Sequence, residues 1–122
     1  MIAIKPRRFR ASFDLSASTV AKAIGDTNVL CEIPEGYSFD HVSIVSSVGL
    51  STATLSIGTA AVPAKYLAAS TIPTADLPVT GGKAAARAGD PPAIKDVVLM
   101  TIGALALPNA GILVIDVFAS GR

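Results

Sequence analysis

The residue types that could carry catalysis are few in this chain, and they are not grouped. It has one histidine, His41, and one cysteine, Cys31, among 122 residues. Asp40 directly precedes His41, and neighbours on a strand point to opposite faces, so we do not expect them to act as base and orienting acid. Cys31 lies between Val29 and Ile33 in an apolar alternation, where a thiol is typically a small buried hydrophobe. We therefore expect no catalytic residue and no enzyme.

Metal and phosphate sites are equally unsupported by residue spacing. The carboxylates near His41 follow no zinc-ligand spacing. Gly81-Gly82-Lys83 is similar to the end of a phosphate-binding loop, but that loop needs glycine and a hydroxyl residue where this chain has Leu77 and Ala84. We expect no metal and no cofactor.

Positive charge is concentrated at the amino-terminal end. Ten Lys and Arg against nine Asp and Glu give a formal charge of +1, and four of the positive residues stand in the first ten: Lys5, Arg7, Arg8 and Arg10. We interpret residues 1–10 as a basic arm that binds an acidic protein surface, a phosphate or a membrane surface, or that only keeps this end soluble. Nucleic-acid binding is not expected, because no basic stripe continues along the chain and only 5% of residues are aromatic.

No apolar segment is long enough to span a membrane. The opening Met1-Ile2-Ala3-Ile4 is followed at once by charge rather than by the apolar stretch of a secretory signal. The longest apolar run, residues 112–115, ends at Asp116 and is far shorter than the roughly 20 residues that cross a bilayer. We expect a protein that stays in the cytoplasm where it is made, outside the membrane and without an internal disulfide.

Alternation of apolar and polar residues predicts strands and no long amphipathic helix. The predicted strands cover residues 8–15, 28–33, 39–50, 53–57, 94–102 and 111–119, with a short hairpin near 49–52. This pattern indicates one all-β domain over residues 1–122, an antiparallel β-sandwich or jelly roll. The last strand is apolar on both faces, so it should be central in the sandwich or covered by a neighbouring subunit.

Residues 63–92 interrupt this pattern with repeated proline and glycine among small residues. At most a short helix near 65–69 and a short strand near 71–77 fit the sequence. So long an irregular segment is usually functional or disordered. It is either a mobile surface loop or a loop ordered by packing on another chain. In the second case its anchors would be Tyr66, Leu67, Ile72 and Leu77.

Turn and strand motifs recur along most of the chain. They are Phe13-Asp14-Leu15-Ser16, Asp26-Thr27, Ile33-Pro34-Glu35-Gly36, Val42-Ser43-Ile44 with Leu50, Ala53-Thr54-Leu55-Ser56-Ile57-Gly58, Lys65-Tyr66-Leu67 and Pro108-Asn109-Ala110-Gly111. Together they resemble the small virion proteins of tailed bacteriophages. Members of that group are β-sandwich or jelly-roll proteins, and several are decoration, or cement, proteins that bind the outside of the capsid as trimers.

The resemblance implies a non-enzymatic decoration protein on the capsid surface of a virion, made in the host cytoplasm and bound to the major capsid protein. It further implies a homotrimer joined through residues 63–92 and the final strand, with Val114 and Phe118. Lys5, Arg7, Arg8 and Arg10 would then reach the capsid. The alternative that the same motifs leave open is a tail or fibre-base component, or a receptor-side binding module, which predicts a pocket or an exposed aromatic cluster.

Overall fold

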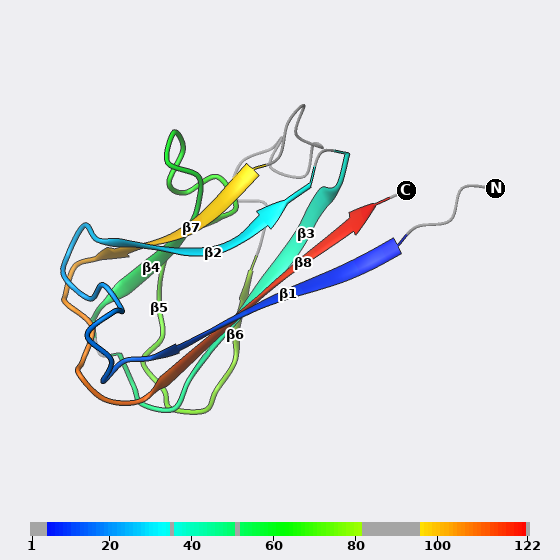
Figure 1. Ribbon diagram of the computed structural model, residues 1–122. Helices are drawn as coiled ribbons and strands as arrows, with labels where there is room; N and C mark the ends of the chain where they lie inside the picture. The colour runs from blue at the N-terminus through cyan, green and yellow to red at the C-terminus, as the bar shows by residue number, and fades with distance from the viewer. Residues whose placement is uncertain (1–4, 35, 51, 82–95, 122) are drawn as a thin grey trace.

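The computed structural model describes residues 5–34, 36–50, 52–81 and 96–121 (Figure 1). Its strands are β1 (Lys5–Asp14), β2 (Thr27–Ile33), β3 (Ser38–Ser46), β4 (Thr54–Gly58), β5 (Leu67–Thr71), β6 (Val79–Gly81), β7 (Asp96–Gly103) and β8 (Ile112–Gly121). These ranges contain no helix, and hence none that is long and apolar enough to cross a membrane. The predicted all-β class is confirmed.

The strands form two four-stranded antiparallel sheets, which pack face to face as a β-sandwich. One sheet has the order β1-β8-β3-β6 and the other β2-β7-β4-β5. Most consecutive strands lie in different sheets, so their connections cross between the two layers at the ends of the sandwich (Figure 1). This strand order is consistent with the predicted jelly roll, which is an eight-stranded arrangement of two sheets.

Strand β8 lies inside its sheet, with β1 on one side and β3 on the other. Its residues Leu113, Ile115 and Val117 point into the sandwich and are fully buried, whereas Ile112 on the outer face is 43% exposed. Apolar residues on both faces predicted a strand that is central or covered by another subunit. The structure shows the central position.

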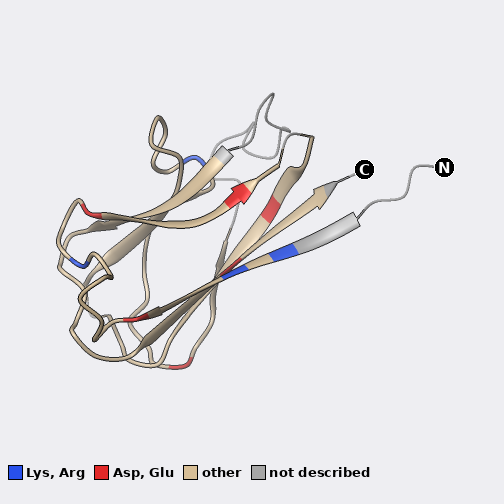
Figure 2. Cartoon of the chain, viewed as in Figure 1, with Lys and Arg blue, Asp and Glu red and all other residues tan. Residues whose placement is uncertain are grey.

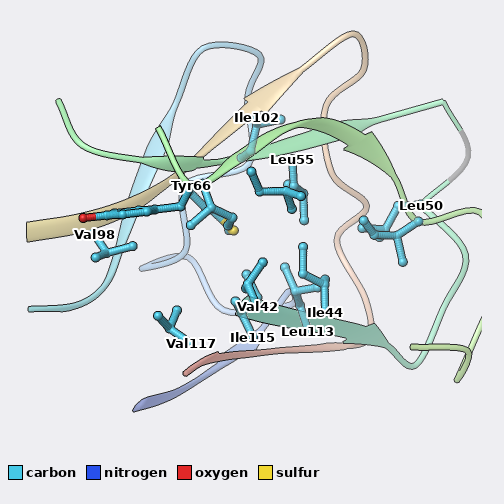
Figure 3. Close-up of a cluster of buried hydrophobic side chains, with 14 of the residues drawn as sticks. Val42, Ile44, Leu50, Leu55, Tyr66, Val98, Ile102, Leu113, Ile115 and Val117 are labelled. Atoms are coloured by element: carbon cyan, nitrogen blue, oxygen red, sulfur yellow. The ribbon is translucent and has the colours of Figure 1, made fainter. Parts of the chain in front are cut away.

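The core is filled by side chains from the facing sides of the two sheets (Figure 3). Val42 and Ile44 of β3 lie on one side, and Leu55, Val98 and Ile102 of the other sheet lie opposite. Full burial of such a side chain contributes roughly 1.5–3 kcal/mol, which exceeds the value of an exposed ion pair. Apolar packing between the layers is therefore the main stabilising interaction of the sandwich.

The connection from β3 to β4 differs from the hairpin predicted near residues 49–52, because β3 and β4 belong to different sheets. Apolar residues continue past β3 to Val48 and Leu50, which made the strand look longer than it is. Strand β3 ends at Ser46, whose hydroxyl donates to Val48 O at 2.5 Å and accepts from Val48 N–H at 3.3 Å. Leu50 instead enters the core, and its N–H donates to Ile72 O at 2.9 Å.

The structure also changes two predicted boundaries. Residues 5–10 of the predicted basic arm are the first part of β1 and pair with β8, whereas residues 1–4 lie outside the described residues. The predicted irregular segment 63–92 contains β5 and β6. Strand β5 begins where a helix was predicted near 65–69, and it ends at Thr71, where a strand to Leu77 was predicted. Residues 82–92 lie outside the described residues.

Candidate interaction surfaces

Cross-strand rows of side chains cover the outer face of the β1-β8-β3-β6 sheet. We define this outer face by the residues that alternate with the buried positions: Arg8, Arg10, Ser12, His41, Ser43, Val45, Val114, Asp116 and Phe118. The register places them in three rows, one aromatic, one charged and one mainly apolar. Figure 2 shows the basic residues along β1, at one edge of this sheet. The surface thus mixes apolar and charged groups.

The charged row is built around an ion pair between β1 and β8. Arg10 Nε donates to Asp116 Oδ1 at 2.8 Å, and Arg10 Nη2 donates to Asp116 Oδ2 at 3.0 Å. The side chain of Arg10 is 54% exposed and that of Asp116 only 14%. The hydrogen bond from Arg10 lowers the pKa of Asp116, assisted by the positive charges of Arg10 and Arg8 and opposed by partial burial. Arg10 is thus already engaged within the chain.

The aromatic row contains His41 stacked on Phe118, with ring centroids 4.2 Å apart and an interplanar angle of 11°. A β-bulge between Phe39 and His41 adds one residue to β3. The Ser120 hydroxyl, on the outer side of β8, donates to Asp40 Oδ2. Asp40 and His41 therefore both reach the outer face, and the prediction that they point to opposite faces is wrong. Each side chain contacts a different residue of β8, since His41 stacks on Phe118 and Asp40 accepts from Ser120.

The described residues offer neither a cluster of metal ligands nor a reactive thiol. Among the described residues, no group of three or more His, Cys, Asp or Glu side chains could hold a metal ion. Cys31 is partly buried against the core, and burial, with a smaller effect of the Glu32 charge, raises its pKa to about 12. At neutral pH this sulfur is therefore a protonated thiol rather than a nucleophilic thiolate.

Three of the four predicted loop anchors are part of the chain's own core. Tyr66, Leu67 and Ile72 are buried, and the ring of Tyr66 lies 4.5 Å from that of Phe39, centroid to centroid. The reason is local, since β5 pairs with β4 and closes the edge of its own sheet. These three residues were predicted as anchors of a loop that packs on another chain, and the structure shows them instead in the core of their own chain. Leu77, in the loop before β6, is 55% exposed.

The other predicted site residues remain at the surface or outside the described side chains. Val114 and Phe118 are partly exposed on the outer face of β8, and Arg8 is exposed on β1. The backbone of residues 5–7 belongs to β1, but the side chains of Lys5 and Arg7 lie outside the described part. The subunit contact and the capsid contact predicted for these residues both remain predictions.

A second apolar surface, which the sequence did not predict, lies on the outer side of the other sheet. Val29 of β2 is 60% exposed and lies opposite Leu99 of β7, and Val97 is also exposed. Alternation placed Val29 on the buried face with Cys31 and Ile33. A register shift between Val29 and Cys31 moves Val29 to the outer side. One extra residue on a strand cannot be recognised from alternation alone.

Comparison of the sequence with protein-family models and with curated proteins finds no match. Solved structures do share the fold. One is a chain of the cyanophage Pam1 capsid asymmetric unit, with a TM-score of 0.66 and 18% identity over 98% of this chain and 85% of that chain. Another is from the acidic stable capsid structure of Helicobacter pylori bacteriophage KHP30, with a TM-score of 0.66 and 18% identity over 94% of this chain and 86% of that chain. A third, from the capsid of Ralstonia phage GP4, has a TM-score of 0.64 and 20% identity over 98% of this chain and 85% of that chain.

Proposed function

We propose that this chain is a non-enzymatic structural protein of a phage virion, and that it is a decoration protein that stabilises the head from the outer capsid surface. The observation that carries the proposal is the likeness, over nearly the whole chain, to chains of three phage capsid structures. Because one fold can host many functions, the surfaces of this chain must support the proposal as well.

The chemistry of the described residues favours a structural role. Cys31 is held as a neutral thiol, His41 is stacked on Phe118, and the neighbouring Asp40 accepts a hydrogen bond from Ser120. The outer face of β8 presents Val114 and Phe118 beside polar residues, a mixture that is typical of protein interfaces. We propose that the subunits form a homotrimer through this face and through the loop that carries Leu77.

The partner that we propose is the major capsid protein, bound through an acidic part of its outer surface. Lys5, Arg7 and Arg8 would supply the complementary charge from the edge of the sandwich, whereas Arg10 is largely committed to Asp116. No role for nucleic acid or membrane is included. A single domain that binds the assembled shell, but not free capsid subunits, stabilises the shell by mass action. Such a protein would be made in the host cytoplasm and would end on the virion surface.

The proposal is tested by sedimenting the purified protein with capsids that lack it, at low and high salt, after its mass has been measured by light scattering. We expect a trimeric unit that pellets with capsids and is released at high salt, because screening weakens exposed charge pairs. Deleting residues 1–10 is unsuitable, since it would remove residues 5–10, more than half of the ten-residue strand β1. The triple variant Lys5→Ala/Arg7→Ala/Arg8→Ala keeps the Arg10–Asp116 pair, and we expect it to bind more weakly.

A matched pair of variants separates local contact from total charge. Arg8→Ala removes one positive charge from β1, and Lys65→Ala removes one from the loop before β5. Only Arg8→Ala is expected to reduce capsid binding. Equal binding by both variants would contradict the contact through β1. A protein that ignores capsids but binds a glycan or a host-cell surface would contradict the decoration role and support the receptor-side alternative.

A further inference from the structure

Among the described strands, only β8 pairs with β1, and the backbone groups of β1 point alternately toward β8 and toward its other edge. Strand β1 stands at the end of its sheet and pairs with β8 from Lys5 to Asp14. The next pair is hydrogen-bonded, since Leu15 N–H donates to Gly111 O at 2.9 Å. Because hydrogen-bonded and non-hydrogen-bonded pairs alternate in an antiparallel ladder, the even-numbered residues of β1 direct N–H and C=O away from β8. These residues include Arg8, Arg10 and Ser12.

Other described segments leave most of this edge uncovered. Among the described backbone hydrogen bonds outside the strand ladders, the even-numbered residues 8–14 contribute only Asp14 O, which accepts from Ala17 N–H at 3.0 Å. The side chains of Arg8, Arg10, Ser12 and Asp14 are exposed on the outer side. On the inner side, Phe9 and Phe13 are only partly buried against the core. An added strand would satisfy the backbone groups and would also cover these two rings.

The sequence of β1 is complementary to itself about Ala11. On the inner side, a phenylalanine stands two positions from Ala11 in each direction, Phe9 and Phe13. On the outer side, a positive and a negative residue stand three positions away, Arg8 and Asp14. We propose that two copies of this chain pair their β1 strands antiparallel about a twofold axis at Ala11. The pairing joins two four-stranded sheets into one continuous sheet.

This register places favourable pairs on both sides of the joined sheet. Phe9 lies opposite the partner's Phe13, and Arg8 lies opposite the partner's Asp14, each pair occurring twice by symmetry. Aromatic pairs and opposite charges across strands are both stabilising. Arg10 lies opposite the partner's Ser12, so its ion pair with Asp116 within the chain is kept. Pro6, which has no N–H, lies beyond the last paired residue of the partner.

The neighbouring registers are less favourable. Hydrogen bonding requires even-numbered residues to lie opposite even-numbered residues, so the axis must pass through a residue, and the nearest alternatives to Ala11 are Arg10 and Ser12. An axis at Arg10 would place two arginines opposite each other and would bring Pro6 into the ladder. An axis at Ser12 would place Phe13 opposite the partner's Ala11 and would draw Arg10 away from Asp116. Of these three registers, the alignment at Ala11 is therefore the most favourable for a second copy of β1.

Cysteine cross-linking tests both the contact and its register. In a Cys31→Ser background, Ala11→Cys would place two thiols across the twofold axis in a non-hydrogen-bonded pair. The Cα atoms of such a pair are about 4.5 Å apart, which falls within the range of disulfides, about 4.4–6.8 Å. We expect a disulfide-linked dimer of Ala11→Cys after mild oxidation. Arg10→Cys and Ser12→Cys in the same background should remain largely uncross-linked, because each would meet its copy only in a shifted register.

The mass of the full chain in solution and an exchange of two charges both test the β1 pairing without cross-linking. We expect wild type to contain an even number of chains at high concentration. If the trimer proposed above also forms, β1 pairing joins trimers two by two into particles of six chains, which dissociate to trimers on dilution. Ser12→Pro removes an N–H that points away from β8, so it should abolish the pairing, whereas Ser12→Ala should keep it. Arg8→Glu should weaken the pairing, and Arg8→Glu/Asp14→Lys should restore it.

Two results would overturn the inference. One is cross-linking of Arg10→Cys or Ser12→Cys in preference to Ala11→Cys. The other is an odd number of chains per particle for wild type at every concentration, with no cross-link at position 11. Neither result depends on capsids, so the edge pairing can fail while the decoration role holds, and the decoration role can fail while the edge pairing holds.

Discussion

Arg10 and Asp116 face each other across the β1–β8 ladder, and the guanidinium of Arg10 bonds both carboxylate oxygens of Asp116, at 2.8 and 3.0 Å. The pair ties edge strand β1 to the inner strand β8. Its acid partner lies on β8, where it is largely covered, whereas the arginine reaches into solvent. This arrangement makes the stability of the β1 edge sensitive to acid.

We expect Asp116→Asn to be less stable than wild type at neutral pH, with a difference that shrinks in acid. The pKa of Asp116 is lowered from 3.8 in the folded state, chiefly by the hydrogen bond from Arg10. The stabilisation by the ion pair is therefore fully present at pH values above the pKa of Asp116 in the unfolded chain. It is lost as the pH falls through the lowered pKa of Asp116 in the folded protein. Thermal unfolding across the range below pH 3.8 measures this. A difference between wild type and variant that does not change with pH would contradict the role of the pair.

The loss should also depend on salt, because Arg10 is exposed. High salt should reduce the difference between wild type and Asp116→Asn at neutral pH. Asp14→Asn is the control. The pKa of Asp14 is also lowered, but chiefly by the hydroxyl and the backbone N–H of Ser16. Its effect on stability should therefore respond less to salt.

Adjacent residues of β8 face opposite sides of the sheet, so we expect very different losses of stability when each is changed to alanine. Ile115→Ala removes a fully buried side chain and should lower the free energy of unfolding by about 2–5 kcal/mol, the usual cost of such a core cavity. Val114→Ala, on the outer face, should cost about 1 kcal/mol or less. Urea unfolding of both variants at several protein concentrations separates stability from self-association. Equal losses would mean that the outer face of β8 is covered, as in the proposed trimer.

The strands themselves followed largely from the alternation of apolar and polar residues. Phe9, Ala11 and Phe13 face inward as predicted, and the two apolar faces of β8 correctly indicated its central place. The alternation failed where a strand gains a residue. The bulges near Val29 and near Asp40 each moved a side chain to a face that a period of two does not allow.

Partner strands and short strands could not be predicted from the same signal. Strand β5 consists of Leu67-Ala68-Ala69-Ser70-Thr71, whose small residues show no clear alternation, and β6 has three residues. Their place depends on distant strands, since β5 completes the sheet beside β4 and β6 lies beside β3. The stack of His41 on Phe118 likewise depends on the β3–β8 register, which joins residues far apart in sequence.

Two glycines with positive φ should differ in their tolerance of alanine. A Cβ at Gly25, where φ is 87°, meets no atom within 4 Å, so Gly25→Ala should cost only the backbone strain, roughly 1–2 kcal/mol. A Cβ at Gly111, where φ is 108°, would lie 2.7 Å from Val48 Cγ2. Gly111→Ala should therefore cost more, by roughly 1–3 kcal/mol of overpacking.

A double variant separates strain from overpacking at Gly111. Val48→Ala removes the methyl groups that the new Cβ would meet, so Gly111→Ala should cost less in that background than in wild type. Urea unfolding of the four proteins of the cycle gives the coupling energy. If the cost of Gly111→Ala is unchanged by Val48→Ala, the contact with Val48 is not its cause.

The thiol of Cys31 should be nearly inert in the folded protein. Its pKa rises from 9.0 to about 12, chiefly through burial. The thiolate is the reactive form. A rise of about three pKa units lowers the fraction of thiolate at neutral pH about a thousandfold. We expect Ellman's reagent to label Cys31 much more slowly in buffer than in concentrated urea, and labelling in buffer to rise with pH well above 9. Equal rates in buffer and urea would show that the segment around Cys31 opens readily. Because Cys31 directly follows the bulge that turns Val29 outward, slow labelling would show that this irregular part of β2 is held closed against the core.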